Sequence, residues 1–114
     1  MSRAAGGAAE RAAAFRELHR AGCFVMPNPW DAGSAHLLAS LGFAAIATSS
    51  AGFAWSQGRR DNGVLLDAVL AHLRAVAGAV TIPVNADFEG GFAVDPDDVA
   101  ANVTAADGTG IAGL

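Results

Sequence analysis

The stretch PVNADFEGGF, residues 83–92, carries the pattern that decides the fold: a short, mostly apolar run that ends in acidic side chains and two glycines. Such a run, at residues 82–86, suits a strand buried on both faces of a parallel sheet. Similar runs recur at residues 23–26, 43–47 and 111–114. Segments with helical apolar spacing lie between these runs, at residues 9–20, 32–41, 65–77 and 96–106. The alternation predicts an α/β fold with a parallel sheet.

Local signals place the ends of these elements. Asp31 and Asp95 are predicted to cap the helices that follow them, and Gly22 stands where a glycine commonly ends a helix. Residues 53–63 are predicted to form a long loop after the second strand. Residues 1–8 are small and lack periodicity, so we expect an irregular start.

Composition excludes several classes of protein. The 114 residues include seven Lys+Arg and eleven Asp+Glu, for a formal net charge of −4. The arginines form no basic stripe, which argues against a nucleic-acid-binding protein. The single cysteine excludes a disulfide within the chain. Only 16% of the residues are charged, below the ~25% of typical soluble domains, so we expect extensive burial or a partner.

No segment has the pattern of a targeting or membrane-spanning sequence. Residues 1–14 are mostly small, but Arg3, Glu10 and Arg11 interrupt them, so they lack the apolar core of a signal peptide. The chain also lacks a stretch of about 20 predominantly apolar residues. We therefore expect a cytoplasmic protein with no membrane partner.

The densest group of polar side chains follows the third predicted strand. In an extended strand Asn85, Asp87 and Glu89 would point to the same side. An amide and two carboxylates offer the hard oxygen ligands that Mg²⁺ prefers. In parallel α/β folds, sites form at the carboxyl ends of the strands, where this group stands. The alternative is that Asp87 and Glu89 belong to a solvated loop.

A second group follows the second predicted strand. Ser49 and Ser50 stand close to Gly52, and their hydroxyls and backbone amides could hold a substrate carboxylate or phosphonate. Ordinary turn chemistry is the alternative. Asp61 stands beside two arginines, which favours a surface ion pair on local grounds. Trp30 follows the first strand and could either wall a pocket or pack beneath a loop.

Histidine and cysteine give weaker signals. His19, His36 and His72 lie within predicted helices, and none is spaced as a ligand pair with another metal-binding residue. They are predicted to be surface or helix-packing residues. Cys23 begins a predicted strand and has no activating partner in the sequence, so we expect a small core residue.

Three ordered motifs resemble the isocitrate lyase/phosphoenolpyruvate mutase family. They are FVMPNPWDAGSA at residues 24–35, ATSSAGFA at residues 47–54 and PVNADFEGGF at residues 83–92. They are similar to the family's first strand and turn, its second strand and substrate loop, and its third strand and metal loop. The resemblance extends from about residue 15 to residue 114. It implies the (β/α)₈ TIM-barrel fold, of which residues 1–114 would form the first four β-α units, an N-terminal half-barrel.

The resemblance also implies a function. Members of the family form or cleave C–C or P–C bonds in small 2-oxo or 2-hydroxy acids, as lyases or phosphonomutases, with Mg²⁺ or Mn²⁺ as cofactor, and associate as homo-oligomers. Carried over by position, the substrate-binding residues are Trp30, Ser49, Ser50, Ala51 and Gly52. The metal-binding residues are Asp61, which reaches the metal through water, Asn85, Asp87 and Glu89. No residue of the chain is assigned as catalytic.

The sequence departs from the family pattern in two ways. Asn85 stands where the first acid of an Asp-x-Asp motif is usual, so it supplies an amide oxygen without charge, for which Glu89 could compensate. The Glu-Asp pair and the catalytic cysteine of the family would come after residue 114. The alternatives to a lyase are therefore a truncated, catalytically inactive fragment and a half-barrel that associates with itself.

Overall fold

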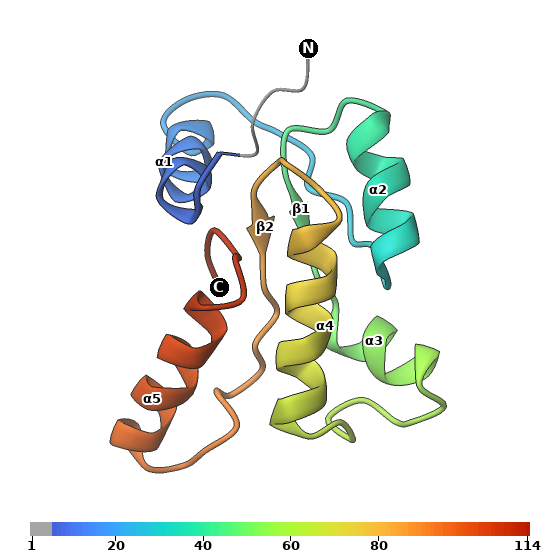
Figure 1. Cartoon of the computed structure of the whole chain (residues 1–114), viewed down its shortest axis with the longest axis vertical. Helices are drawn as coiled ribbons and strands as arrows, with labels where there is room; N and C mark the ends of the chain where they lie inside the picture. The colour runs from blue at the N-terminus through green and yellow to red at the C-terminus, as the bar shows by residue number, and fades with distance from the viewer. Residues whose placement is uncertain (1–5) are drawn as a thin grey trace.

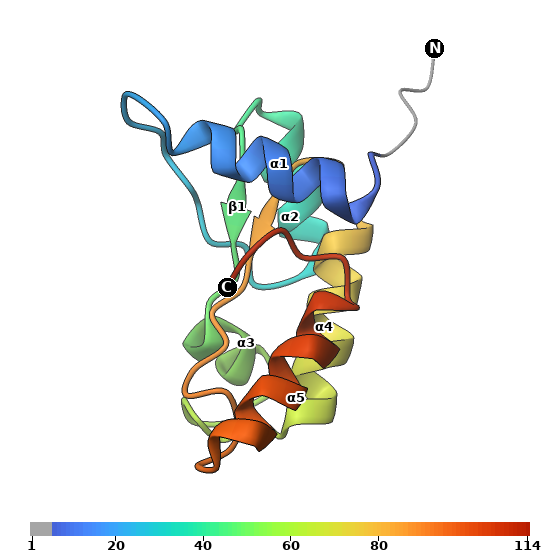
Figure 2. The same ribbon diagram turned by 90° about the vertical axis from the view of Figure 1, so that its left-hand side faces the viewer.

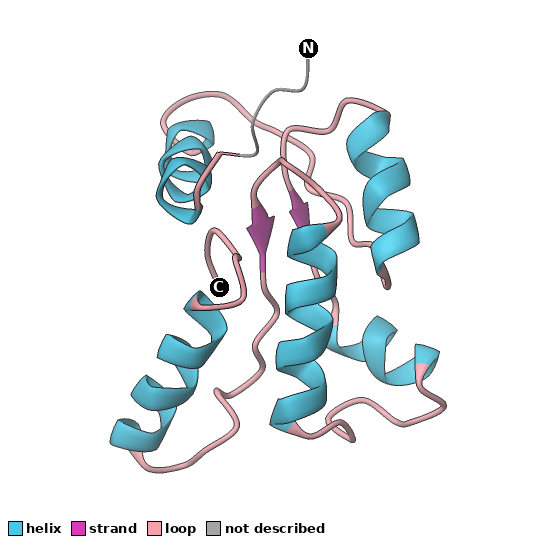
Figure 3. Cartoon of the chain, in the orientation of Figure 1, coloured by secondary structure: helices cyan, strands magenta, loops and turns pink. Residues whose placement is uncertain are grey.

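A computed structural model of the chain describes residues 6–114 (Figure 1). Within these residues it contains five helices and two short strands, joined by long irregular segments (Figure 3). The helices are α1 (Ala8–Leu18), α2 (Ala32–Ser40), α3 (Ser50–Ser56), α4 (Leu66–Gly78) and α5 (Pro96–Asp107). The strands are β1 (Ile46–Ala47) and β2 (Val84–Asn85). The chain is thus an α/β unit, as the alternation of apolar runs and helical segments predicts.

The two strands are parallel, with Ile46 opposite Val84. Extended segments continue the hydrogen bonding on both sides. The amide of Ala47 donates to the carbonyl of Pro27 at 3.0 Å, and the amide of Ala86 donates to the carbonyl of Gly113 at 2.8 Å. The four predicted strand regions therefore lie side by side in chain order, although the first and last hold too few backbone hydrogen bonds to count as strands.

Helix α4 packs between α2 and α5 and contributes four buried residues, Val69, Leu73, Val76 and Ala77, to the core (Figures 1 and 2). The core joins the two strands to these helices and contains, among others, Ile46, Phe53, Leu73, Val76, Val84 and Ile111. Helix α1 lies across the end of the sheet where the strands begin, and Arg11 donates to the carbonyl of Ala77 at 2.8 Å. Helix α3 lies at the opposite end, where the strands finish. No helix within residues 6–114 is long and apolar enough to cross a membrane.

The structure corrects two of the predictions and leaves one partly open. Residues 50–56 form helix α3, whereas residues 53–63 are predicted to be a loop; Ser49 caps this helix by accepting from the amide of Gly52 at 3.1 Å. Cys23 is exposed and is not a core residue, because it follows the turn after α1 and is not part of a strand. Of the predicted irregular start, residues 1–5 lie outside the described part of the chain.

Candidate functional site

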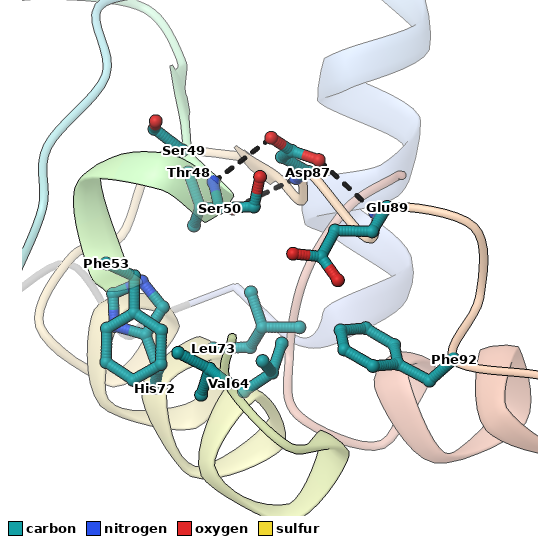
Figure 4. Close-up of a pocket in the computed structure, with 11 residues that line it drawn as sticks. Thr48, Ser49, Ser50, Phe53, Val64, His72, Leu73, Asp87, Glu89 and Phe92 are labelled. Carbon is teal, nitrogen blue, oxygen red and sulfur yellow. Dashed lines mark hydrogen bonds between the residues drawn. The ribbon is translucent and has the colours of Figure 1, made fainter. Parts of the chain in front are cut away.

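A pocket lies at the carboxyl ends of the two strands, between α3, α4 and the loop that follows β2 (Figure 4). One side of it is polar and is formed by Thr48, Ser49, Ser50, Asp87 and Glu89. The other side is formed mainly by apolar and aromatic side chains, which are Phe53, Val64, Val69, His72, Leu73 and Phe92. A concave site with polar groups on one wall and apolar groups on the other is typical of small-molecule binding.

Asp87 accepts hydrogen bonds from a backbone amide at the start of α3 and from one in its own loop. The amide of Ser50 donates to its Oδ2 at 3.0 Å, and the amide of Glu89 donates to its Oδ1 at 3.2 Å. Its own amide donates to the hydroxyl of Thr48 at 2.9 Å. Residues that stand 37 to 39 positions apart in the sequence are joined here because parallel strands bring their carboxyl ends to one edge.

The two carboxyl groups of this loop have opposite environments. Partial burial raises the pKa of Asp87, but the hydrogen bonds from the amide and hydroxyl of Ser50 and the amide of Glu89 outweigh it, so the pKa lies below the ordinary 3.8. Burial, together with the negative charges of Asp61 and Asp87, raises the pKa of Glu89 above 4.5. The carboxyl group of Asp87 is therefore ionised at neutral pH, whereas ionisation of Glu89 is opposed by two nearby negative charges.

Asp61 approaches the site from the segment after α3. Its Oδ1 accepts from the hydroxyl of Ser50 at 3.4 Å and from the amide of Asn62 at 2.9 Å. Asn62 has a positive φ of 61°, a conformation that asparagine tolerates better than most residues. Ser50 thus connects Asp61 to Asp87, and no ion pair with the neighbouring arginines is present among the described residues.

The remaining predicted site residues lie around this pocket but do not line it. Asn85 lies in β2 and its side-chain oxygen faces Gly113, on the side of the last extended segment. The predicted alternation of side chains does not extend from Asn85 to Glu89, because β2 ends at Asn85 and Glu89 has a positive φ of 52°. Trp30 covers Gly52, and Ala51 lies beside it in the first turn of α3.

Two polar residues of the pocket, Thr48 and His72, were not predicted as site residues from the sequence, nor was its apolar wall. Thr48 is 5% exposed and accepts from Asp87; its position directly after a buried strand is the signal that could have indicated it. His72 stacks on Phe53 with ring centroids 3.9 Å apart, and its Nε2 is buried without a hydrogen-bond partner in the described residues. Burial lowers the pKa of His72, although the charge of Asp31 opposes this, so we expect a neutral ring.

The donor chemistry of the site fits a hard cation. Asp87 and Glu89 line the pocket, and burial together with the nearby negative charges of Asp61 and Asp87 raises the pKa of Glu89, so a cation here would offset part of this repulsion. Within residues 6–114, however, no three His, Cys, Asp or Glu side chains are grouped closely enough to hold a metal ion by themselves. A cation at this site would therefore have only one or two carboxylates of the described residues and would keep several waters, as Mg²⁺ commonly does.

Known proteins resemble this chain in sequence and in backbone fold. The uncharacterized protein Rv1998c of Mycobacterium tuberculosis is 36% identical over 87 residues, which cover 75% of this chain and 34% of that protein. The crystal structure of a predicted lyase/mutase from Burkholderia cenocepacia J2315 superposes with a TM-score of 0.89 at 48% identity, covering 91% of this chain and 38% of that one. A phosphonopyruvate hydrolase solved with oxalate and Mg²⁺ superposes with a TM-score of 0.83 at 26% identity, over 89% of this chain and 36% of that one.

The chain thus spans little more than a third of the length of these relatives. The sequence profile of phosphoenolpyruvate phosphomutase matches residues 15–114, which include every residue that lines the pocket, as well as Asp61. A match of this extent confirms the resemblance drawn from the three sequence motifs: the chain belongs to the phosphoenolpyruvate phosphomutase family.

Proposed function

We propose that this chain carries the first part of the active site of a Mg²⁺-dependent enzyme that forms or cleaves C–C or P–C bonds in 2-oxo or 2-hydroxy acids. The observation that carries the proposal is the position of Ser50, whose amide donates to Asp87 and whose hydroxyl donates to Asp61. This residue links a segment suited to binding an oxyacid with carboxylates suited to a divalent cation.

Residues Ser49 to Gly52 would hold the carboxylate and oxo groups of the substrate, with Trp30 alongside. Ser49 and Ser50 line the polar wall of the pocket, and the apolar wall opposite would exclude water from the carbon skeleton. The oxalate bound in the phosphonopyruvate hydrolase supports a small dicarboxylate or 2-oxo acid as the ligand class.

Asp87 and Glu89 would hold Mg²⁺, or Mn²⁺ in its place, directly, and Asp61 would reach it through water. When bound, the metal would polarise the oxo group and stabilise the negative charge of an enolate-like intermediate. Asp87 suits this role because its lowered pKa keeps it ionised. Asn85 would contribute at most a neutral oxygen, and its orientation toward Gly113 makes it the weakest member of the predicted set.

We also propose that these residues form the first four β-α units of a barrel, because four extended segments lie in chain order and the chain matches little more than a third of longer proteins. The outermost segments carry Val25 and Leu114, which are 68% and 52% exposed. Association of copies through these edges is the corresponding prediction for the isolated chain, and sedimentation equilibrium tests it.

Titration calorimetry of the full chain with Mg²⁺, in the presence and absence of oxalate, tests the site. We expect binding that oxalate strengthens and that Asp87→Asn weakens at least about tenfold, because the substitution removes a direct charged ligand. Asp97→Asn, an equal loss of charge at the exposed start of α5, is the matched control and should bind as the original chain does. Absence of binding in the original chain, or equal loss in the two variants, would contradict the proposed metal site.

A further inference from the structure

Trp30 lies against the first turn of α3 and not in the pocket itself. Its backbone amide donates to the hydroxyl of Ser34 at 3.2 Å, which ties it to the start of α2. Trp30 is 44% exposed. Its indole ring packs edge to face against the ring of Trp55, with ring centroids 5.8 Å apart. The pocket of Figure 4 is lined without it.

The indole covers Gly52 at close range. A Cβ atom placed on Gly52 would collide with three ring atoms of Trp30, namely Nε1, Cδ1 and Cε2. The collision involves a rigid, planar ring, so a small rotation of the side chain cannot relieve it. Gly52 is itself buried, with ordinary helical backbone, so the glycine is required here by the ring above it and not by an unusual φ.

The turn under this ring makes the contacts that define the site. The amide of Gly52 donates to the hydroxyl of Ser49, and two residues earlier the amide of Ser50 donates to Asp87. These amides belong to one rigid helical turn, so a displacement of Gly52 moves the amide of Ser50 with it. A hydrogen bond weakens steeply as its geometry departs from the optimum, so small displacements are enough to uncouple Ser50 from Asp87.

We propose that Trp30 is a positioning residue that acts through Gly52: its ring fixes the first turn of α3 and thereby aims the amide of Ser50 at the Asp87 carboxylate. The proposal rests on the proposed function only in taking that turn as the substrate-binding segment. The contact and its effect on Asp87 exist whether or not a metal binds.

The test measures hydrogen exchange of the Ser50 amide by two-dimensional ¹H–¹⁵N NMR at neutral pH, relative to the amides of α4. In the original chain the Ser50 amide should exchange slowly, because it donates to the Asp87 carboxylate. Gly52→Ala should raise the exchange rate of the Ser50 amide at least about tenfold. In the Trp30→Ala background, the same glycine substitution should change this exchange rate by less than about twofold, because the colliding ring is gone.

Trp55→Ala is the control, since Trp55 meets the Trp30 ring edge to face but the ring atoms over Gly52 are those of Trp30, so the Ser50 exchange rate should stay unchanged. If Gly52→Ala does not fold, Trp30→Ala and Trp30→Phe decide the question alone: the first should speed the exchange of the Ser50 amide and the second should largely preserve its protection. An unchanged Ser50 exchange rate in Trp30→Ala, or equal effects of Gly52→Ala in both backgrounds, overturns the proposal. Failure of Mg²⁺ to bind leaves this result untouched, so the two proposals fail independently.

Discussion

Replacement of Thr48 by valine removes one hydrogen bond, between the residue that follows β1 and the backbone of Asp87 in the pocket. The hydroxyl of Thr48, a residue that is 5% exposed, accepts from the backbone amide of Asp87 at 2.9 Å. That amide has no second acceptor among the described residues. Valine has nearly the same shape as threonine, so Thr48→Val removes the acceptor without opening a cavity and leaves a partly buried N–H unpaired.

The expected loss is about 1–3 kcal/mol in the free energy of unfolding, the usual cost of an unsatisfied buried donor. Domains of this size have a total stability of about 5–15 kcal/mol, so the loss is a substantial fraction of the whole. Since 1 kcal/mol corresponds to about 4–8 °C for small domains, Thr48→Val should lower Tm by at least about 4 °C.

Thr109 provides a matched control because it is equally buried at 5%. Its hydroxyl donates to the carbonyl of Ala106 at 2.6 Å, but that carbonyl also accepts from the Thr109 amide at 3.0 Å. Thr109→Val therefore leaves the carbonyl paired and should cost about 1 kcal/mol or less. Thr48→Ser keeps the acceptor and should recover most of the loss.

Urea unfolding followed by circular dichroism measures all three variants, with the m-value used to confirm that the transitions are comparable. Equal losses in Thr48→Val and Thr109→Val would mean that shape or general polarity, and not the unpaired amide of Asp87, determines the cost. A neutral Thr48→Val would refute the reasoning entirely.

Two further predictions concern titratable groups. Glu89→Gln should raise the free energy of unfolding at pH 7, because burial and the charges of Asp61 and Asp87 raise the pKa of Glu89 in the folded state. This gain should shrink as pH falls below about 4.5, where the glutamate becomes protonated in both states, and urea unfolding at pH 7 and pH 4 measures it. His72→Phe should keep the stack on Phe53 and remove the unpaired Nε2. Because burial lowers the pKa of His72 in the folded state below 6.5, the original chain should lose stability as pH falls below 6.5, and the variant should lose less. Thermal melts between pH 7.5 and 5.5 measure both chains, and parallel losses would contradict the prediction.

Helix ends were predictable where a few neighbouring residues determine them. Asp31 accepts from the amide of Ser34 in a capping box, and Asp95 accepts from the amides of the first turn of α5, as their positions in the sequence indicate. Helix α3 was missed because its stability depends on distant contacts. Its Phe53 is buried in the core and its Gly52 lies under Trp30, and neither contact can be read from residues 50–56 alone.

The sequence by itself determined the α/β class and the family, because apolar periodicity, turn residues and short motifs are local properties. It also placed Ser50 and Asp87 at strand ends, where parallel strands share an edge. Only the tertiary structure decided which atoms meet: the Ser50 amide on the Asp87 carboxylate, the Thr48 hydroxyl beneath it and the Trp30 ring on Gly52. The physical reason is that each of these contacts joins separate elements, and its geometry depends on how the whole α/β unit packs.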